Sequence, residues 1–355
     1  MSILDRYVVR AILGSVLLVL AVFLVLGGLF AFISQQGDIG VGHYTLLDAL
    51  WFTLLNLPQQ AYELLPITAM MGSLLGLGAL ARGSEIVVLR ATGMSVARLA
   101  AAALIAAAVL IALEAVVGEF VAPQLQEAAN QQRAFSQYGT ISFGGGTGAW
   151  VRDGDLILNV ARQSSSRQFG GMQVFQLSST HQLLAVGHAT RATAAGHDRW
   201  LLDHYAASHF AGDRVTVRKP GRKVLHSDIS ASFLGFTVQD PAQMTLRALW
   251  QLIGYLHTNS LDAGQYEFAF WSRIARIFAI AFAVLLAVPF VLGSMRSAGA
   301  GTRAMLALAI GIGFFLLQRL IESGTIVFHL NPVIVAWLPT ALLATVTLLL
   351  LARAR

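Results

Sequence analysis

The residues best placed for chemistry lie in a short polar segment between two apolar runs. Residues 81–93 read A-R-G-S-E-I-V-V-L-R-A-T-G. The pattern predicts a short helix over Glu85–Ala91, with Ser84 as its N-cap and Gly93 at its end. Glu85 would then lie at the positive end of the helix, which stabilises a carboxylate.

The same predicted helix carries apolar surface as well as charge. Ile86, Val87 and Leu89 are apolar, and Arg90 adds a second charge. Such a helix is either a docking element for a partner protein or an interfacial helix lying on a membrane. Composition alone favours neither role.

No group of residues has the spacing of a catalytic or metal site. The phosphate-binding pattern G-x-x-x-x-G-K-[ST] is absent, and Gly144–Gly148 lacks the lysine, so we predict a hairpin turn there. The patterns G-x-S-x-G and H-E-x-x-H are absent too, and the nine histidines are scattered. With no cysteine, disulfides and thiolate metal sites are excluded. We expect a non-catalytic chain without a cofactor or metal of its own.

The composition indicates a protein solvated largely by lipid. Of 355 residues, 56% are hydrophobic and 12% charged, whereas an average soluble domain has about a quarter of its residues charged. The net charge of +6 comes from dispersed residues, nearly all of them arginine. This dispersion argues against nucleic acid as a partner.

Six apolar runs have the length of a membrane span. A bilayer core about 30 Å thick needs about 20 apolar residues in a helix. The six runs cover approximately 11–33, 46–81, 96–121, 268–292, 304–320 and 332–351. Within the second run, Pro58 and Pro66 free backbone carbonyls. Gly72, Gly76 and Gly78 favour close helix packing there.

The arginines near the span ends predict the orientation. Nine lie on one side: Arg6, Arg10, Arg82, Arg90, Arg98, Arg296, Arg303, Arg353 and Arg355. The opposite loops, 34–45 and 322–331, contain neither lysine nor arginine. Because positive residues stay on the cytoplasmic side, both termini are predicted to be cytoplasmic.

A long segment after the third span has a different character. Between about residues 139 and 239, short apolar stretches alternate with turn-rich pieces such as 153–155, 170–171 and 219–221. This spacing predicts an all-β sandwich or roll on the outer side. A helix is predicted over 245–257. The predicted domains are a first helical half (1–138), the β domain (139–240), and a connecting helix with a second helical half (241–355).

Motifs along the whole chain resemble the LptF/LptG permeases of the lipopolysaccharide exporter. They are L-D-R-Y at 4–7, L-L-G-L-G at 74–78, S-E-I-V-V-L-R-A-T-G at 84–93, G-E-F-V-A-P-Q at 118–124 and W-S-R-I at 271–274. Within the family the chain is more similar to the LptG subunits. The resemblance implies a six-span membrane protein with an inserted periplasmic β-jellyroll-like domain.

The resemblance also implies a function and a set of partners. LptF/LptG permeases extract lipopolysaccharide from the outer leaflet of the bacterial inner membrane and pass it to a periplasmic bridge towards the outer membrane. The implied partners are LptF, two copies of the ATPase LptB, LptC and the bridge protein LptA, with ATP and Mg in LptB. Residues 84–93 correspond to the coupling helix, where the implied ATPase-coupling residues are Ser84, Glu85, Arg90 and Gly93.

The lipid-binding residues depart from the family pattern. The family has lysines near the outer end of the first helix, where this sequence has Ala31, Gly37 and Asp38. It has another after the second helix's first proline, where this sequence has Gln59. Arg133 matches a family arginine, and Arg319 is an additional cation near the end of the fifth span. We expect these two to bind lipid phosphate, although Arg319 could instead pair with Glu322.

The fifth span is a second place where lipid is expected. Ile310, Phe314 and Leu317 lie on one face of it, and the family places this helix at the lateral gate of the cavity, where it contacts acyl chains. Core packing is the alternative for these three residues.

Four further charged residues, and the function itself, have alternative interpretations. Arg273 and Arg276 either line the outer rim or anchor the fourth span, and Glu114 and Glu119 have few polar partners along their own helix. The functional alternatives are the paralogous LptF subunit and a membrane-anchored β-domain scaffold without a transport role.

Overall fold

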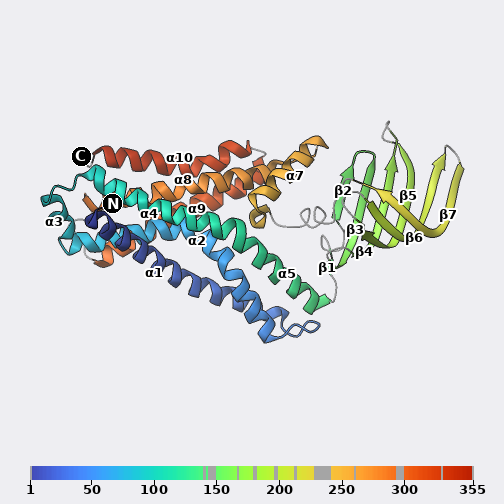
Figure 1. Cartoon of the computed structure of the whole chain (residues 1–355), viewed down its shortest axis with the longest axis horizontal. Helices are drawn as coiled ribbons and strands as arrows, with labels where there is room; N and C mark the ends of the chain where they lie inside the picture. Colours follow the sequence, from blue (N-terminus) through green and yellow to red (C-terminus); the bar gives the residue numbers. More distant parts are fainter. Residues whose placement is uncertain are drawn as a thin grey trace.

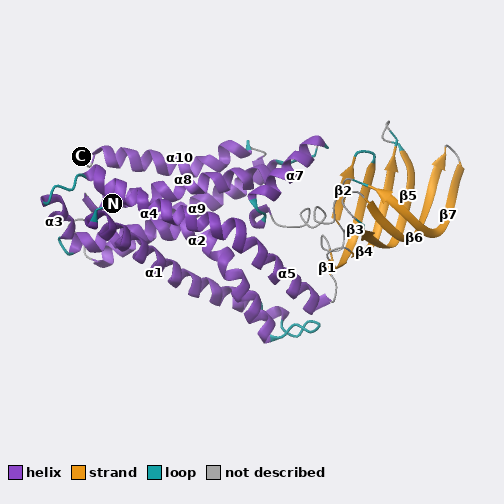
Figure 2. Ribbon diagram, viewed as in Figure 1, coloured by secondary structure: helices purple, strands orange, loops and turns teal. Residues whose placement is uncertain are grey.

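The computed structural model describes residues 2–138, 141–142, 149–165, 168–178, 182–195, 199–211, 214–227, 241–259, 261–292, 300–328 and 331–353. The chain forms a bundle of long helices, and a β-sheet lies beyond one end of that bundle (Figure 1). Helices and strands are segregated into these two parts (Figure 2). The short helix α3 and both chain termini lie at the bundle end away from the sheet.

Five described helical stretches are long and apolar enough to cross a membrane. The helices that form them are α1 (Ile3–Ser34), α2 (Leu46–Arg82), α4 (Val96–Val116), α8 (Gly264–Leu292) and α10 (Pro332–Arg353). α4 continues without a break through a π-helical turn (Val117–Val121) into α5 (Ala122–Tyr138). The fifth predicted span corresponds to α9 (Ala300–Phe328), whose apolar described stretch is the shorter Leu308–Gln318. Six spans therefore stay a prediction.

Local capping starts the first two helices. Ser2 and Asp5 form a capping box at the start of α1, and Thr45 and Asp48 form another at the start of α2. Each box satisfies backbone N–H groups that have no partner inside the helix. Arg98 on α4 also donates to Asp5, at 3.0 Å, and so ties the ends of α1 and α4 together.

Glycines allow α1 and α2 to approach closely, as the sequence predicted for two of them. A Cβ atom at Gly72 would collide with the backbone of Val16, and one at Gly76 would lie 2.8 Å from the carbonyl oxygen of Ala11. Val16, like Ile12 one turn earlier, is completely buried. Dispersion between two backbones in contact holds such helices together, since lipid supplies no hydrophobic drive.

The β domain is an antiparallel sheet, which confirms the predicted change to strands. Its strands are β1 (Ile141–Ser142), β2 (Ala149–Asp153), β3 (Leu156–Ser165), β4 (Gln168–Leu177), β5 (Leu183–Ala194), β6 (Arg199–Ala211) and β7 (Arg214–His226). The order is β1-β3-β4-β5-β6-β7, with β2 also pairing with β3. The described strands make one sheet, so the jellyroll-like arrangement stays a prediction.

Two predicted turns in this domain are wrong. Residues 170–171 lie inside β4, and residues 219–221 lie inside β7. Gly171 takes a φ of 66° within its strand, a conformation that glycine adopts at no steric cost. Pro220 is tolerated because β7 is an edge strand among the described residues. The turn at 153–155 is confirmed, and Gly144–Gly148 lies outside the described residues.

One face of the sheet carries a separate apolar core. Phe169 packs edge-on against Trp200, with ring centroids 5.3 Å apart, and both are fully buried. The ring of Tyr205 occupies the space in which a side chain at Gly187 would lie. The Nζ atom of Lys223 lies 4.7 Å from the centre of that ring, and burial lowers the pKa of this lysine.

Helix α7 (Leu246–Thr258) confirms the predicted connecting helix. Thr245 caps it by accepting a hydrogen bond from the N–H of Ala248. Leu249 and Leu252 are buried in a small cluster with Phe270 of α8. Tyr255 packs against both this cluster and the core of the β domain. α7 therefore contacts the bundle and the β domain at once.

The contact between α1 and α2 predicts the effect of filling Gly72. Gly72→Ala forces the helices apart and should destabilise the protein by about 1–3 kcal/mol, as overpacking does. Gly14→Ala is the matched control, because a Cβ atom there meets nothing within 4 Å. Thermal unfolding of the detergent-solubilised chain should show a lower midpoint for Gly72→Ala alone. Equal midpoints for the two variants would contradict the close contact.

Candidate functional site

The predicted short helix at the end away from the sheet is present as α3 (Glu85–Ala91). Gly93 has a φ of 93°, and the N–H groups of Gly93 and Met94 donate to the carbonyls of Arg90 and Leu89. Gly93 therefore ends the helix as expected. The capping role of Ser84 is wrong: its φ of 59° is left-handed, and its side chain makes no capping hydrogen bond.

Only part of the apolar surface predicted for α3 is exposed. Ile86 and Leu89 are buried in the main core of the bundle. Val87 and Val88 are 48% and 60% exposed. One face thus fixes α3 to the bundle, and the other presents two adjacent valines and leaves Arg90 exposed.

Glu85 is held by a residue from the start of the chain. The hydroxyl of Tyr7 on α1 donates to Oε2 of Glu85 at 2.6 Å. This contact joins two of the recognised motifs, which lie 78 positions apart. Sequence spacing alone could not have paired them.

Arg133 lies near the other end of the bundle and already has partners. Its guanidinium pairs with Asp38, just beyond α1, and lies 5.4 Å from the centre of the Phe52 ring. The structure thus brings Arg133 and Asp38 together, although 95 positions separate them in the sequence. An anion that binds Arg133 would have to exchange with Asp38 or add to the pair.

The other predicted lipid-binding residues lie on α9. Ile310 and Phe314 are half-buried and pack against the main core, and Leu317 is half-buried as well. Arg319 belongs to α9, but its side chain and that of Glu322 lie outside the described residues. Their predicted roles stay predictions.

The structure brings together a polar cluster that sequence reasoning missed. Glu114 of α4 is 4% exposed, and its Oε1 atom lies 3.8 Å from Nε of Arg276 on α8. Arg273 and Arg276 both lie over the ring of Tyr62, with 5.4 Å and 4.6 Å from the guanidinium carbon to the ring centre. The partners of Glu114 therefore come from other helices, not from its own.

Pro66 explains why Arg276 reaches α2. Proline has no N–H, so the carbonyl of Tyr62, four residues earlier, loses its helical donor. Nη1 of Arg276 donates to this carbonyl at 3.4 Å. The sequence signal was present in part, because Arg273 and Arg276 are three residues apart and share one helix face.

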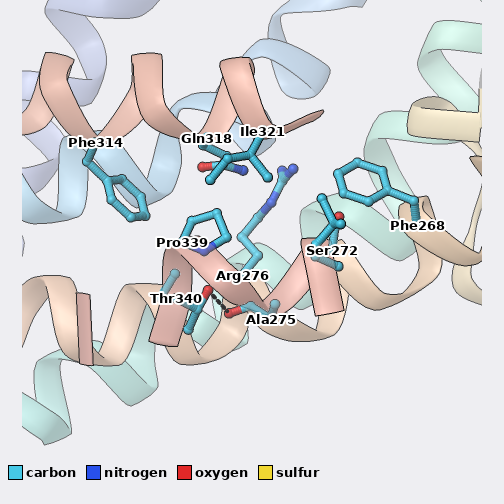
Figure 3. Close-up of a pocket in the computed structure, with 12 residues that line it drawn as sticks. Phe268, Ser272, Ala275, Arg276, Phe314, Gln318, Ile321, Pro339 and Thr340 are labelled. Atoms are coloured by element: carbon cyan, nitrogen blue, oxygen red, sulfur yellow. Dashed lines mark hydrogen bonds between the residues drawn. The ribbon is translucent and has the colours of Figure 1, made fainter. Parts of the chain in front are cut away.

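Arg276 also borders a pocket between α8, α9 and α10 (Figure 3). The pocket is small, with a cavity volume of about 50 Å³. Its lining is apolar at Phe268, Phe314 and Pro339, and polar at Ser272 and Gln318.

An apolar slot beside a cation suits part of an amphiphile better than a reacting substrate. The described residues contain no group of three His, Asp or Glu side chains that could hold a metal ion.

Comparisons with known proteins agree with the motifs. The family described as lipopolysaccharide export system permease LptF/LptG matches residues 6–353. The lipopolysaccharide export system permease protein LptG of Escherichia coli (strain K12) is 30% identical over 354 residues, which is 99% of this chain and 98% of that protein. The LptG protein of Haemophilus influenzae is 25% identical over 353 residues, 99% of each chain. The resemblance drawn from the sequence is confirmed.

The buried pair predicts non-additive stabilities. Arg276→Met leaves Glu114 buried without its cation, which should destabilise the chain by on the order of 3 kcal/mol. Adding Glu114→Gln should then recover part of the loss, because no carboxylate remains to be compensated. Thermal unfolding of both variants measures this, with Arg247→Met on the exposed face of α7 as the control. If the double variant is no more stable than Arg276→Met, the stability that Arg276 contributes does not come from its ion pair with Glu114.

Proposed function

Because the chain belongs to the LptF/LptG family of lipopolysaccharide export permeases, we propose that it is the LptG-type subunit of an ATP-driven exporter. It extracts lipopolysaccharide from the outer leaflet of the inner membrane and passes it towards a periplasmic bridge. The family match over residues 6–353 is the main support. Relatives named LptG, together with the G-E-F-V-A-P-Q and W-S-R-I motifs, favour this subunit over LptF.

The orientation follows from the arginines. The end of the bundle that carries α3 and both termini faces the cytoplasm, because the basic residues collect there. The β domain then lies in the periplasm. This arrangement puts α3 on the side where ATP is available and the β domain on the side to which lipid is delivered.

Helix α3 couples the permease to the ATPase. Two LptB subunits bind and hydrolyse ATP with Mg, and one of them docks on the exposed face of α3. The two exposed valines supply apolar contact, and Glu85, oriented by Tyr7, supplies a directed charge. Ile86 and Leu89 anchor the opposite face in the core, so a push on α3 moves the bundle rather than a loose loop.

The lipid is bound through charge and apolar surface. Arg133 and Arg319 bind phosphate, and Ile310, Phe314 and Leu317 contact acyl chains. Charge-assisted hydrogen bonds from arginine to phosphate favour this pairing. At Arg133 the phosphate replaces Asp38, whose ion pair is only partly buried. LptF completes the cavity, LptC joins the assembly, and LptA receives the lipid.

Changing Glu85 tests the coupling. In the assembled transporter, Glu85→Ala should lower lipid-stimulated ATP hydrolysis roughly ten-fold, the equivalent of one charge-assisted hydrogen bond. Tyr7→Phe keeps the carboxylate but removes its hydroxyl donor, and should give a smaller loss. Glu127→Ala, an exposed carboxylate on α5, is the control. Undiminished hydrolysis and undiminished recovery of the ATPase with Glu85→Ala would favour the scaffold alternative.

Changing Arg319 tests the lipid contact. A cation inside a span is unfavourable by about 2.5–3.5 kcal/mol on insertion scales, so its presence indicates a partner. Arg319→Ala should reduce lipopolysaccharide crosslinking and lipid-stimulated ATP hydrolysis roughly ten-fold. Arg303→Ala, near the opposite end of the same helix, should reduce neither. Intact crosslinking and hydrolysis with Arg319→Ala would remove this residue from the site.

A further inference from the structure

The chain returns from the β domain to the bundle through a segment that the bundle grips at two points. This segment comprises the turn Pro241–Gln243 and the start of α7. Nη2 of Arg273 on α8 donates to the carbonyl of Ala242 at 3.0 Å. Oε2 of Glu119 accepts from the N–H of Leu246 at 2.9 Å. Both bonds join a charged side chain to the backbone, so they fix the position of the chain itself. These two hydrogen bonds are the two grips.

The bond from Glu119 suits its place at a helix start. Leu246 is the first residue of α7, where backbone N–H groups lack helical partners and the helix dipole favours a carboxylate. Thr245 caps the N–H of Ala248, so the two side chains satisfy different donors. With thirteen residues, α7 is long enough for its dipole to stabilise a carboxylate at its N-terminus.

The two gripping residues are linked to each other through Tyr62. Glu119 belongs to the π-helical turn between α4 and α5, next to Gly118. Gly118 lies so close to the Tyr62 ring that a Cβ atom there would collide with it. Arg273 lies over the same ring. A shift of α4 or α8 relative to α2 therefore changes the position of one grip or both.

Beyond these two hydrogen bonds, α7 packs along α8 and contacts the β domain through Tyr255. His257 near its end lies 2.8 Å from Glu267 of α8, and Leu249 and Leu252 are buried against that helix. Tyr255 packs against the core of the β domain as well. α7 thus contacts both parts of the molecule.

We propose that Glu119 and Arg273 are positioning residues that clamp the start of α7, so that movement of α4 and α8 carries the β domain with it. The role of the clamp in transport rests on the proposed function: the clamp keeps the β domain aligned with the bundle while lipid is handed over. The proposed role does not require either residue to contact lipid. The clamp acts through geometry alone.

The absence of cysteine allows a direct test in the full-length chain. Spin labels on Val217→Cys in β7 and Ile334→Cys in α10 report the distance between the β domain and the bundle, since both side chains are exposed. A second pair, Leu47→Cys and Ile334→Cys, lies within the bundle and checks that each variant is folded. Electron–electron double resonance then measures the distance distributions.

Loss of either grip should release the β domain. Glu119→Ala and Arg273→Gln should each broaden the domain-to-bundle distribution and raise the displaced population roughly ten-fold, while the pair within the bundle is unchanged. Glu119→Gln still offers an oxygen to the Leu246 N–H and should fall in between. Arg247→Gln, an exposed neighbour on α7, should change nothing. Distributions that stay unchanged in Glu119→Ala and Arg273→Gln would overturn the clamp.

A second readout separates the clamp from the proposed function. In the assembled transporter, Glu119→Ala should lower the lipid delivered per ATP hydrolysed, with the hydrolysis rate kept. Unchanged delivery despite a displaced β domain would overturn the role in handover. An unaltered chain that delivers no lipid would refute the proposed function, whereas the distance measurement would still decide the clamp.

Discussion

A missing hydrogen-bond donor in the longest helix organises the half of the bundle nearer the β domain. Pro66 has no N–H to give to the carbonyl of Tyr62, and Arg276 supplies the donor instead. No water in a bilayer core can compensate a buried arginine, so it needs an anion within the protein, which is Glu114. Tyr62, Gly118 and Arg273 then pack around this pair. The proline and the buried charges therefore belong to one packed cluster.

The two ends of the bundle differ in structure. At the α3 end, a short helix is anchored on one face and exposed on the other, with Glu85 fixed by Tyr7. At the opposite end, Glu119 and Arg273 hydrogen-bond to the backbone through which the chain returns from the β domain. Between them, α1 and α2 pack backbone to backbone through Gly72 and Gly76. The long helices therefore connect two ends with different surfaces and contacts.

Much of the fold could be predicted from the sequence, because its causes are local. Apolar runs and alternating strands follow from single stretches of chain, and so do the ends of α3, apart from its cap. Ser84 fails as a cap because the turn from α2 forces it into a left-handed conformation. Strand β7 continues through Pro220 because an edge strand can do without that donor. The pairs Tyr7–Glu85, Arg133–Asp38 and Arg276–Glu114 were not predictable, since each joins helices whose relative rotation is set by tertiary packing.

The proposed role of this chain is that of the permease subunit of a lipopolysaccharide exporter driven by a separate ATPase. The most direct measurement is affinity purification of the chain from its native membranes, with every copurifying protein and lipid identified. If the chain has this role, an ATPase, a second permease of the same family and lipopolysaccharide will be recovered with it. Recovery of the chain alone, under conditions that keep other transporters of this kind whole, would contradict it.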